Sequence, residues 1–189
     1  MTSFTVAPSF AVAHSECVFP WQVFLGCENM SNLFTVQRKL SPATPEEGRR
    51  LDTVAEFHLG EFVNKFRAGS LVLKIPDSTS VCMYPSMLFG TVTGSIGLIV
   101  QLPEKVFEKL GKLQSNLSRL IESVGGFKHG QWRAFCSERR THDARGFVDG
   151  DLIERLLELP AETAAEAVNG TNSSVDEMML LVDELSRLH

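Results

Sequence analysis

The sequence has no excess of basic charge. Its 189 residues include 18 Lys and Arg against 23 Asp and Glu, which gives a formal net charge of -5 at pH 7. A protein that binds nucleic acid without sequence specificity usually presents a basic surface, because neutralisation of phosphates supplies its affinity. The overall charge therefore argues against a general nucleic-acid binder and leaves only local basic clusters to consider.

Closely spaced cysteines and long apolar runs are also missing. The four cysteines are scattered, and no two of them have the short spacing of a zinc or redox motif. They are Cys17, Cys27, Cys82 and Cys136. Free thiols are typical of reducing compartments, so we expect a protein of the nucleus or the cytoplasm. No apolar run reaches the roughly 18 residues that a membrane-spanning helix needs, and we expect no membrane partner.

The residue patterns of common enzymes are absent as well. Gly90, Gly94 and Gly97 lack both the spacing and the lysine of a phosphate-binding loop. Asp149 and Asp151 are a conceivable acid–base pair, but aspartates at a helix start more often accept backbone N–H bonds and complement the helix dipole. We therefore expect no enzyme, no cofactor and no metal site.

The histidines are isolated from one another along the chain. His58 lies in an apolar, strand-like stretch, where we expect a structural histidine whose ring has hydrogen-bond partners. His129 and His142 lie among polar residues, and we expect both to be surface groups. The spacing of a His-Glu-x-x-His zinc motif does not occur.

The first half of the sequence contains a succession of short strand-like stretches. Val, Ile and Phe are concentrated in them, and turn signals such as Thr93-Gly94 separate them. The expected strands are 23–26, 32–37, 57–66, 71–75, 87–92 and 95–101, with a long exposed loop over 40–52. Short strands joined by short turns form an antiparallel meander, as in a propeller blade or part of a barrel or sandwich. The first 22 residues show no clear period, and we expect no regular structure there.

Beyond Pro103 the apolar residues recur at intervals of three and four, which indicates amphipathic helices. Gly125-Gly126 is typical of a helix end, and Ser174 with Glu177 matches a capping box at a helix start. The expected helices are 103–124, a short one around 132–135, 149–160 and 174–188, with a linker over 169–174. The sequence thus predicts a β plus α fold.

One local basic cluster stands against the acidic average. It lies within a single short stretch with only Glu138 and Asp143 opposing it, and it consists of Lys128, Arg133, Arg139, Arg140 and Arg145. A phosphate-binding patch is one interpretation. The other is a solvated face whose cations pair with neighbouring acids, which we favour because such pairs are common at protein surfaces. The basic–aromatic alternation of RNA-binding surfaces is absent from the cluster.

Several longer motifs carry a family resemblance that extends from about Phe24 to His189. The most specific run is Phe-His-Leu-Gly-Glu-Phe-Val-Asn at 57–64, and a looser one is Gly-Asp-Leu-Ile-Glu at 150–154. Others are Phe-Leu-Gly-Cys-Glu-Asn at 24–29, Leu-Phe-Gly-Thr-Val at 88–92 and Glu-Leu-Ser-Arg-Leu-His at 184–189. Together they resemble the large subunit of the UV-damaged-DNA-binding complex. They are also similar to the large subunit of the cleavage and polyadenylation factor and to a splicing-factor subunit.

The resemblance implies a particular division of the chain. Residues 23–102 would be the last antiparallel blades of an incomplete β-propeller, and 103–189 a small C-terminal helical domain. Residues 1–22 form an N-terminal segment without a match. The complete relatives would have three propellers and would act as adaptors in a cullin–RING ubiquitin ligase, in nuclear DNA repair and protein turnover. The propeller that binds the cullin is expected to lie outside this chain.

The resemblance also implies a partner surface. Phe62, Asn64 and Val92 match positions that line a pocket into which helical segments of WD-repeat substrate receptors insert. Phe62 and Asn64 should share one strand face, because side chains alternate along a strand. Lys65 stands where the family has an apolar residue, and its charge would weaken apolar contacts or select an acidic partner. The alternatives are that Phe62 and Val92 are ordinary sheet core, and that the chain is a nucleic-acid-binding subunit of the processing-factor type.

Overall fold

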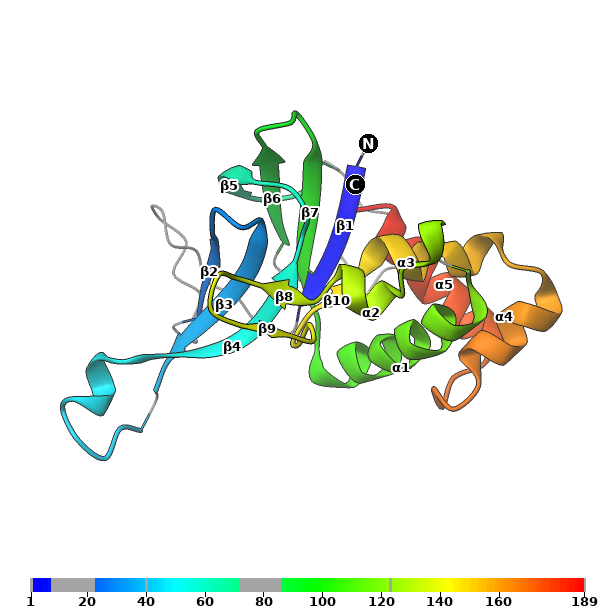
Figure 1. Ribbon diagram of the computed structural model, residues 1–189. Helices are drawn as coiled ribbons and strands as arrows, with labels where there is room; N and C mark the ends of the chain where they lie inside the picture. Colours follow the sequence, from blue (N-terminus) through cyan, green and yellow to red (C-terminus); the bar gives the residue numbers. More distant parts are fainter. Residues whose placement is uncertain (1, 8–22, 40, 72–85, 123, 189) are drawn as a thin grey trace.

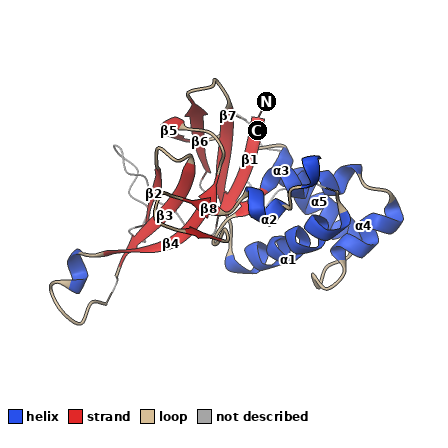
Figure 2. Cartoon of the chain, viewed as in Figure 1, coloured by secondary structure: helices blue, strands red, loops and turns tan. Residues whose placement is uncertain are grey.

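The computed structural model describes residues 2–7, 23–39, 41–71, 86–122 and 124–188. The sheets lie on one side of the molecule and the helices gather on the other (Figures 1 and 2). The expected order, antiparallel strands followed by C-terminal helices, is confirmed. The small open sheets are consistent with partial propeller blades.

The first sheet is a three-stranded antiparallel meander. Its strands are β2 (Val23–Cys27), β3 (Asn32–Arg38) and β4 (Leu51–His58), in that order. The connection between β3 and β4 contains the short 3-10 helix η1 (Glu47–Arg49) and projects away from the body of the molecule (Figure 1). This loop is where the polar, proline-containing sequence predicted one.

The second sheet contains a strand that the sequence did not predict. Its strands lie in the order β10 (Val148–Asp149), β1 (Thr2–Ala7), β7 (Ile96–Gln101), β6 (Ser86–Thr91) and β5 (Val63–Ala68). β1 runs parallel to β7 and antiparallel to β10 (Figure 1). The expectation that the first 22 residues have no regular structure is therefore wrong for Thr2–Ala7, because this strand takes its hydrogen bonds from β10 and β7 on either side, which its own residue pattern does not reveal.

The stretch 57–66 is not one strand, as its run of Phe and Val predicted. β4 ends at His58, the chain turns at Gly60, and β5 begins at Val63. Gly60 has φ of 87°, which favours glycine, and a Cβ there would lie 2.8 Å from the Trp132 ring. The predicted strand 71–75 falls, apart from Leu71, outside the described residues.

Five α-helices lie in the described C-terminal part. They are α1 (Glu104–Leu120), α2 (His129–Trp132), α3 (Gly150–Glu154), α4 (Ala161–Val168) and α5 (Val175–Ser186). Short 3-10 helices, η3 (Val124–Gly126) and η4 (Arg155–Glu158), follow α1 and α3. A two-stranded ribbon, β8 (Phe135–Cys136) with β9 (Thr141–His142), interrupts them. The alanine-rich stretch of α4 gives little apolar contrast, so the sequence did not predict this helix, and Phe135, predicted in a helix, lies in β8.

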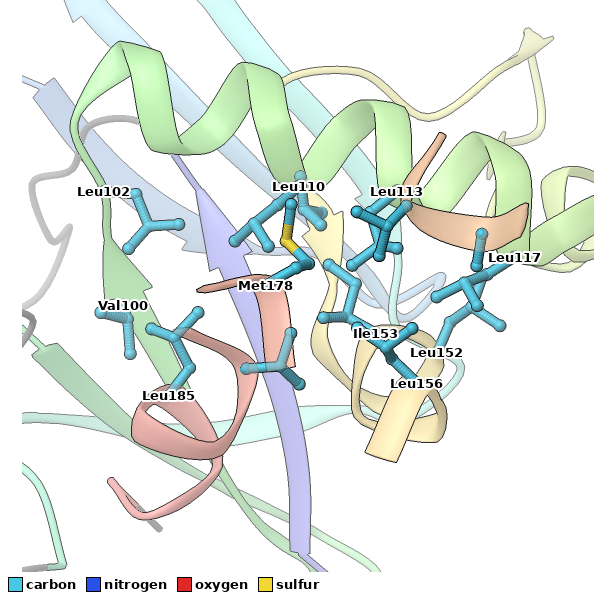
Figure 3. Close-up of a cluster of buried hydrophobic side chains, with 14 of the residues drawn as sticks. Val100, Leu102, Leu110, Leu113, Leu117, Leu152, Ile153, Leu156, Met178 and Leu185 are labelled. Carbon is cyan, nitrogen blue, oxygen red and sulfur yellow. The ribbon is translucent and has the colours of Figure 1, made fainter. Parts of the chain in front are cut away.

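Strand β7 separates two hydrophobic cores. Leu98 and Val100 belong to the core that the helices form, whereas Ile99 belongs to the core between the sheets. This division follows from the alternation of side chains along a strand. In the helical core, Leu113 of α1 and Leu156 of η4 are fully buried (Figure 3). The helices therefore bury their apolar faces against one another and against β7.

Candidate functional site

The predicted partner residues Phe62 and Val92 lie side by side. The Val92 N–H donates a hydrogen bond to the Phe62 carbonyl oxygen at 3.0 Å, just beyond the paired ends of β5 and β6. Both side chains are exposed, Phe62 by 44% and Val92 by 66%. Neither is a sheet-core residue in this chain, which removes the simplest alternative to a binding role.

Asn64 and Lys65 lie in β5, just after Phe62, and both are exposed. The pairing between β5 and β6 shifts register between Val63 and Lys65, so Asn64 lies at a bulge. A bulge disturbs the strict alternation of side chains along a strand. The alternation of side chains therefore does not show that Phe62 and Asn64 share one face. Phe62 and Val92 are instead brought together by the backbone hydrogen bond between them.

Glu61 supports this surface, and the sequence analysis overlooked it. Thr93 Oγ1 donates to Glu61 Oε2 at 2.8 Å, and Ser95 Oγ donates to Glu61 Oε1 at 3.1 Å. Hydrogen bonds from the Thr91 and Thr93 hydroxyls hold the pKa of Glu61 below its usual value. The carboxylate thus links the turn after Val92 to the chain before Phe62. In the sequence, the only sign of this role is the cluster of hydroxyl residues around that turn.

The basic cluster is divided by two buried carboxylates. The first is Asp149, which accepts hydrogen bonds from Arg133 Nε at 2.6 Å and from His129 Nε2 at 2.7 Å. Arg133 is itself buried and also donates to the Leu59 carbonyl oxygen at 3.1 Å. Asp149 occupies the N-cap position of α3 but makes no side-chain cap hydrogen bond, so the expected capping role is wrong. His129 is likewise a partner in this pair rather than a free surface group.

The second buried carboxylate is Glu56 of β4. Arg140 and Arg145 both donate to it, and the closest Arg145 contact, from Nη2 to Oε2, is 2.7 Å. His142 Nε2 lies 3.2 Å from the same oxygen, and its ring stacks on Phe135. His142 remains partly exposed, at 32% of its side chain, so the expectation of a surface group holds in part, and the ring also contacts Glu56. His58 agrees with its expectation, because its Nδ1 lies 2.9 Å from Asn32 Oδ1.

Arg133, Arg140 and Arg145 thus have carboxylate partners, and Lys128 and Arg139 are exposed. The arrangement resembles the ion-paired face that we favoured over a phosphate patch. A phosphate-binding role for the cluster stays a prediction. Within the described residues, no group of three or more His, Cys, Asp or Glu side chains is placed to hold a metal ion.

The Asp149 pair makes the stability of the fold depend on pH. Burial alone would raise the pKa of Asp149, but the His129 hydrogen bond and the Arg133 charge hold that pKa below its usual value. A carboxyl group with a lowered pKa in the folded state stabilises fully above its unfolded pKa of about 4, and this contribution is lost as the pH falls through the folded value.

We therefore expect Asp149→Asn to lower the free energy of unfolding by about 1.5–3 kcal/mol at pH 7. This difference from the native chain should shrink as the pH falls below about 4. Urea unfolding of both chains between neutral pH and strong acid measures it. A difference that stays constant throughout the acid range would show that the charge of Asp149 contributes nothing.

Comparisons with known proteins place the chain in a family. Residues 7–158 match the family described as the CPSF A subunit region. DNA damage-binding protein 1 of Solanum lycopersicum is 50% identical over 167 residues. DNA damage-binding protein 1a of Arabidopsis thaliana is 48% identical over 167 residues, and DNA damage-binding protein 1 of Oryza sativa subsp. japonica is 45% identical over 168.

The structure is that of a chain with open β-sheets followed by a helical part. The chain belongs to the CPSF A subunit region family. The matched part is 88% of this chain for the tomato protein and 89% for the rice protein, but only 15% of either relative. None of the described helices is both long and apolar enough to cross a membrane.

Proposed function

We propose that this chain corresponds to the C-terminal part of a DNA damage-binding adaptor that acts by holding other proteins together. The family match and the relatives' name support this role. The observation that carries it is the exposed Phe62–Val92 pair, which Glu61 holds beside an ordered turn. Aromatic and aliphatic anchors of this kind supply most of the binding energy in many protein interfaces.

The proposed partners are WD-repeat substrate receptors. A helical segment of a receptor would place apolar side chains against Phe62 and Val92, and the exposed Asn64 amide would orient the receptor's polar groups. Lys65 would favour a receptor with an acidic residue at the edge of the contact. A cullin–RING ligase would be reached only through propellers outside this chain, so the chain would act within a larger nuclear or cytoplasmic assembly and carry out no catalysis itself.

The test transfers residues 23–189 into a full-length relative in place of its matching part. We expect Phe62→Ala in this chimera to weaken binding of a purified WD-repeat receptor by about 2 kcal/mol, roughly 30-fold, because an exposed aromatic anchor is lost. We expect Lys65→Val to strengthen binding of a receptor with an apolar contact. Surface plasmon resonance measures both, with urea unfolding recorded in parallel.

The matched control is Leu51→Ala, which also removes an exposed apolar side chain, but on β4 away from the pair. It should leave receptor affinity unchanged. If Phe62→Ala leaves the affinity unchanged while the chimera unfolds at lower urea, Phe62 supports the sheet and the pocket proposal fails.

A second candidate function is nucleic-acid binding of the mRNA-processing type, carried by the two cations of the basic cluster, Lys128 and Arg139, that have no carboxylate partner among the described residues. The acidic net charge and the ion pairs of the other three cations count against it. Binding to a labelled single strand or duplex that weakens steeply with added salt would favour this function over the adaptor.

A further inference from the structure

A cavity of about 910 Å³ lies between α1, α2 and α3, on the helical side of the molecule. These elements lie next to one another in Figure 1. Ile121 after α1 and Leu152 of α3 contribute apolar surface, and Phe127 and Trp132 contribute aromatic rings. None of the residues of the proposed receptor surface lines this cavity, so it is a separate feature of the chain.

The two aromatic rings are unusually exposed for their size. Phe127 is 70% exposed and Trp132 is 51% exposed, although both line a concave surface. Aromatic side chains gathered at a cavity are typical of binding sites, because they offer a large contact area with little loss of side-chain entropy. Their faces also attract cations.

A buried acceptor in the same cavity lacks a partner. Asp149 lines the cavity and is only 2% exposed. Its Oδ2 atom accepts from Arg133 and His129, but its buried Oδ1 atom has no hydrogen-bond partner among the described residues. Buried carboxylate oxygens in folded proteins are nearly always hydrogen-bonded. This oxygen is shielded from the cavity by the atoms around it, so Asp149 contributes negative charge to the lining rather than a hydrogen bond to a bound molecule.

The charged groups around the cavity determine which charge a bound molecule would carry. Its lining includes the carboxylates of Glu122, Asp149 and Asp151, the guanidinium of Arg155, and the imidazoles of His58 and His129. Arg133 lies behind them and pairs with both Asp149 and Asp151. With Arg133 included, three carboxylates stand against two guanidinium groups, and this net negative charge favours a cation over an anion.

We propose that this cavity binds an arginine side chain on an apolar segment of a partner protein. The guanidinium carries several N–H donors, which suit the accessible carboxylates of Asp151 and Glu122. Its planar face stacks on Trp132 or Phe127. The cavity exceeds the size of a single side chain, and Ile121 and Leu152 provide contacts for apolar neighbours of the arginine in the partner segment.

The probe is the capped tripeptide acetyl-Leu-Arg-Leu-amide, tested on the full 189-residue chain. Its matched control replaces arginine with citrulline, which keeps the shape and most N–H groups but removes the charge. The chain has two tryptophans, so a Trp21→Phe background lets Trp132 fluorescence report binding at the cavity. We expect the arginine peptide to bind about tenfold more tightly than the citrulline peptide.

Two substitutions locate the site. Asp151→Asn and Glu122→Gln each remove one lining carboxylate from the outer part of the cavity, and each should weaken the arginine peptide about threefold to fivefold. Glu162→Gln on α4 removes an exposed carboxylate elsewhere and should change nothing. Urea midpoints measured in parallel separate a binding effect from a loss of folding.

Three results would overturn the proposal. They are equal binding of the arginine and citrulline peptides, tighter binding of a glutamate-containing peptide, and no saturable signal with arginine peptide up to about 10 mM. Retained affinity in both Asp151→Asn and Glu122→Gln would likewise place the arginine elsewhere. The receptor-binding test with Phe62→Ala uses a different surface, so either proposal can fail without the other.

Discussion

Replacing Arg133 by Met is expected to lower the free energy of unfolding by about 3–5 kcal/mol, because it leaves the buried Asp149 charge without its guanidinium. The Arg133 side chain is only 8% exposed. Besides Asp149, its guanidinium donates to the Leu59 carbonyl oxygen and lies over the Phe57 ring at 4.9 Å from the centroid. The pair thus joins the turn after β4 to the start of α3, and equilibrium urea unfolding measures its contribution.

Two further variants separate the charge from the packing. Arg139→Met removes an exposed arginine from the same stretch and should change stability by less than about 0.5 kcal/mol. The double substitution Arg133→Met with Asp149→Leu removes both charges and should be less destabilising than Arg133→Met alone. If the double variant is as unstable as the sum of the single variants, the two side chains are not energetically coupled.

Replacing Leu156 by Ala should destabilise the fold by about 2–5 kcal/mol, since it leaves a cavity among closely packed side chains. Leu156 is fully buried in η4, in the core that α1, α3 and α5 form with β7 (Figure 3). For a chain of this size, each kcal/mol lowers the melting temperature by about 2–4 °C. Urea and thermal unfolding give the two values.

The matched control for this core substitution is Leu180→Ala on α5. Leu180 is 60% exposed, so its truncation removes little buried surface and should cost less than about 0.5 kcal/mol. Similar losses for the two variants would contradict the assignment of Leu156 to the core and would indicate that α5 packs through its Leu180 face.

The local features of this fold were readable in the sequence. Ser174 and Glu177 form the predicted capping box, with the Glu177 N–H donating to Ser174 Oγ at 3.2 Å. The predicted hairpin around Thr93-Gly94 appears as β6 and β7, and Gly94 has φ of 95°. These features depend on residues within a few positions of each other. The family resemblance depends instead on several motifs taken together.

The candidate receptor surface was only half predictable. The family motif pointed to Phe62 and Val92, but only the tertiary structure shows them exposed and joined by a backbone hydrogen bond. The register of β5 against β6 shifts at Asn64, and bulges leave little trace in a hydrophobic pattern. Glu61 acquires its role through hydroxyls more than thirty positions away.

The sequence by itself determined the types of the larger elements, the general order of antiparallel strands before C-terminal helices, and the family. The tertiary structure alone decided which charges neutralise one another and which side chains remain free to bind. Glu56 meets Arg145 across 89 positions, Arg133 meets Asp149 across 16, and Thr2–Ala7 joins a sheet beside Ile96–Gln101. Partners this far apart are set by burial and packing of the whole chain, whereas residue patterns record only the preferences of neighbouring positions.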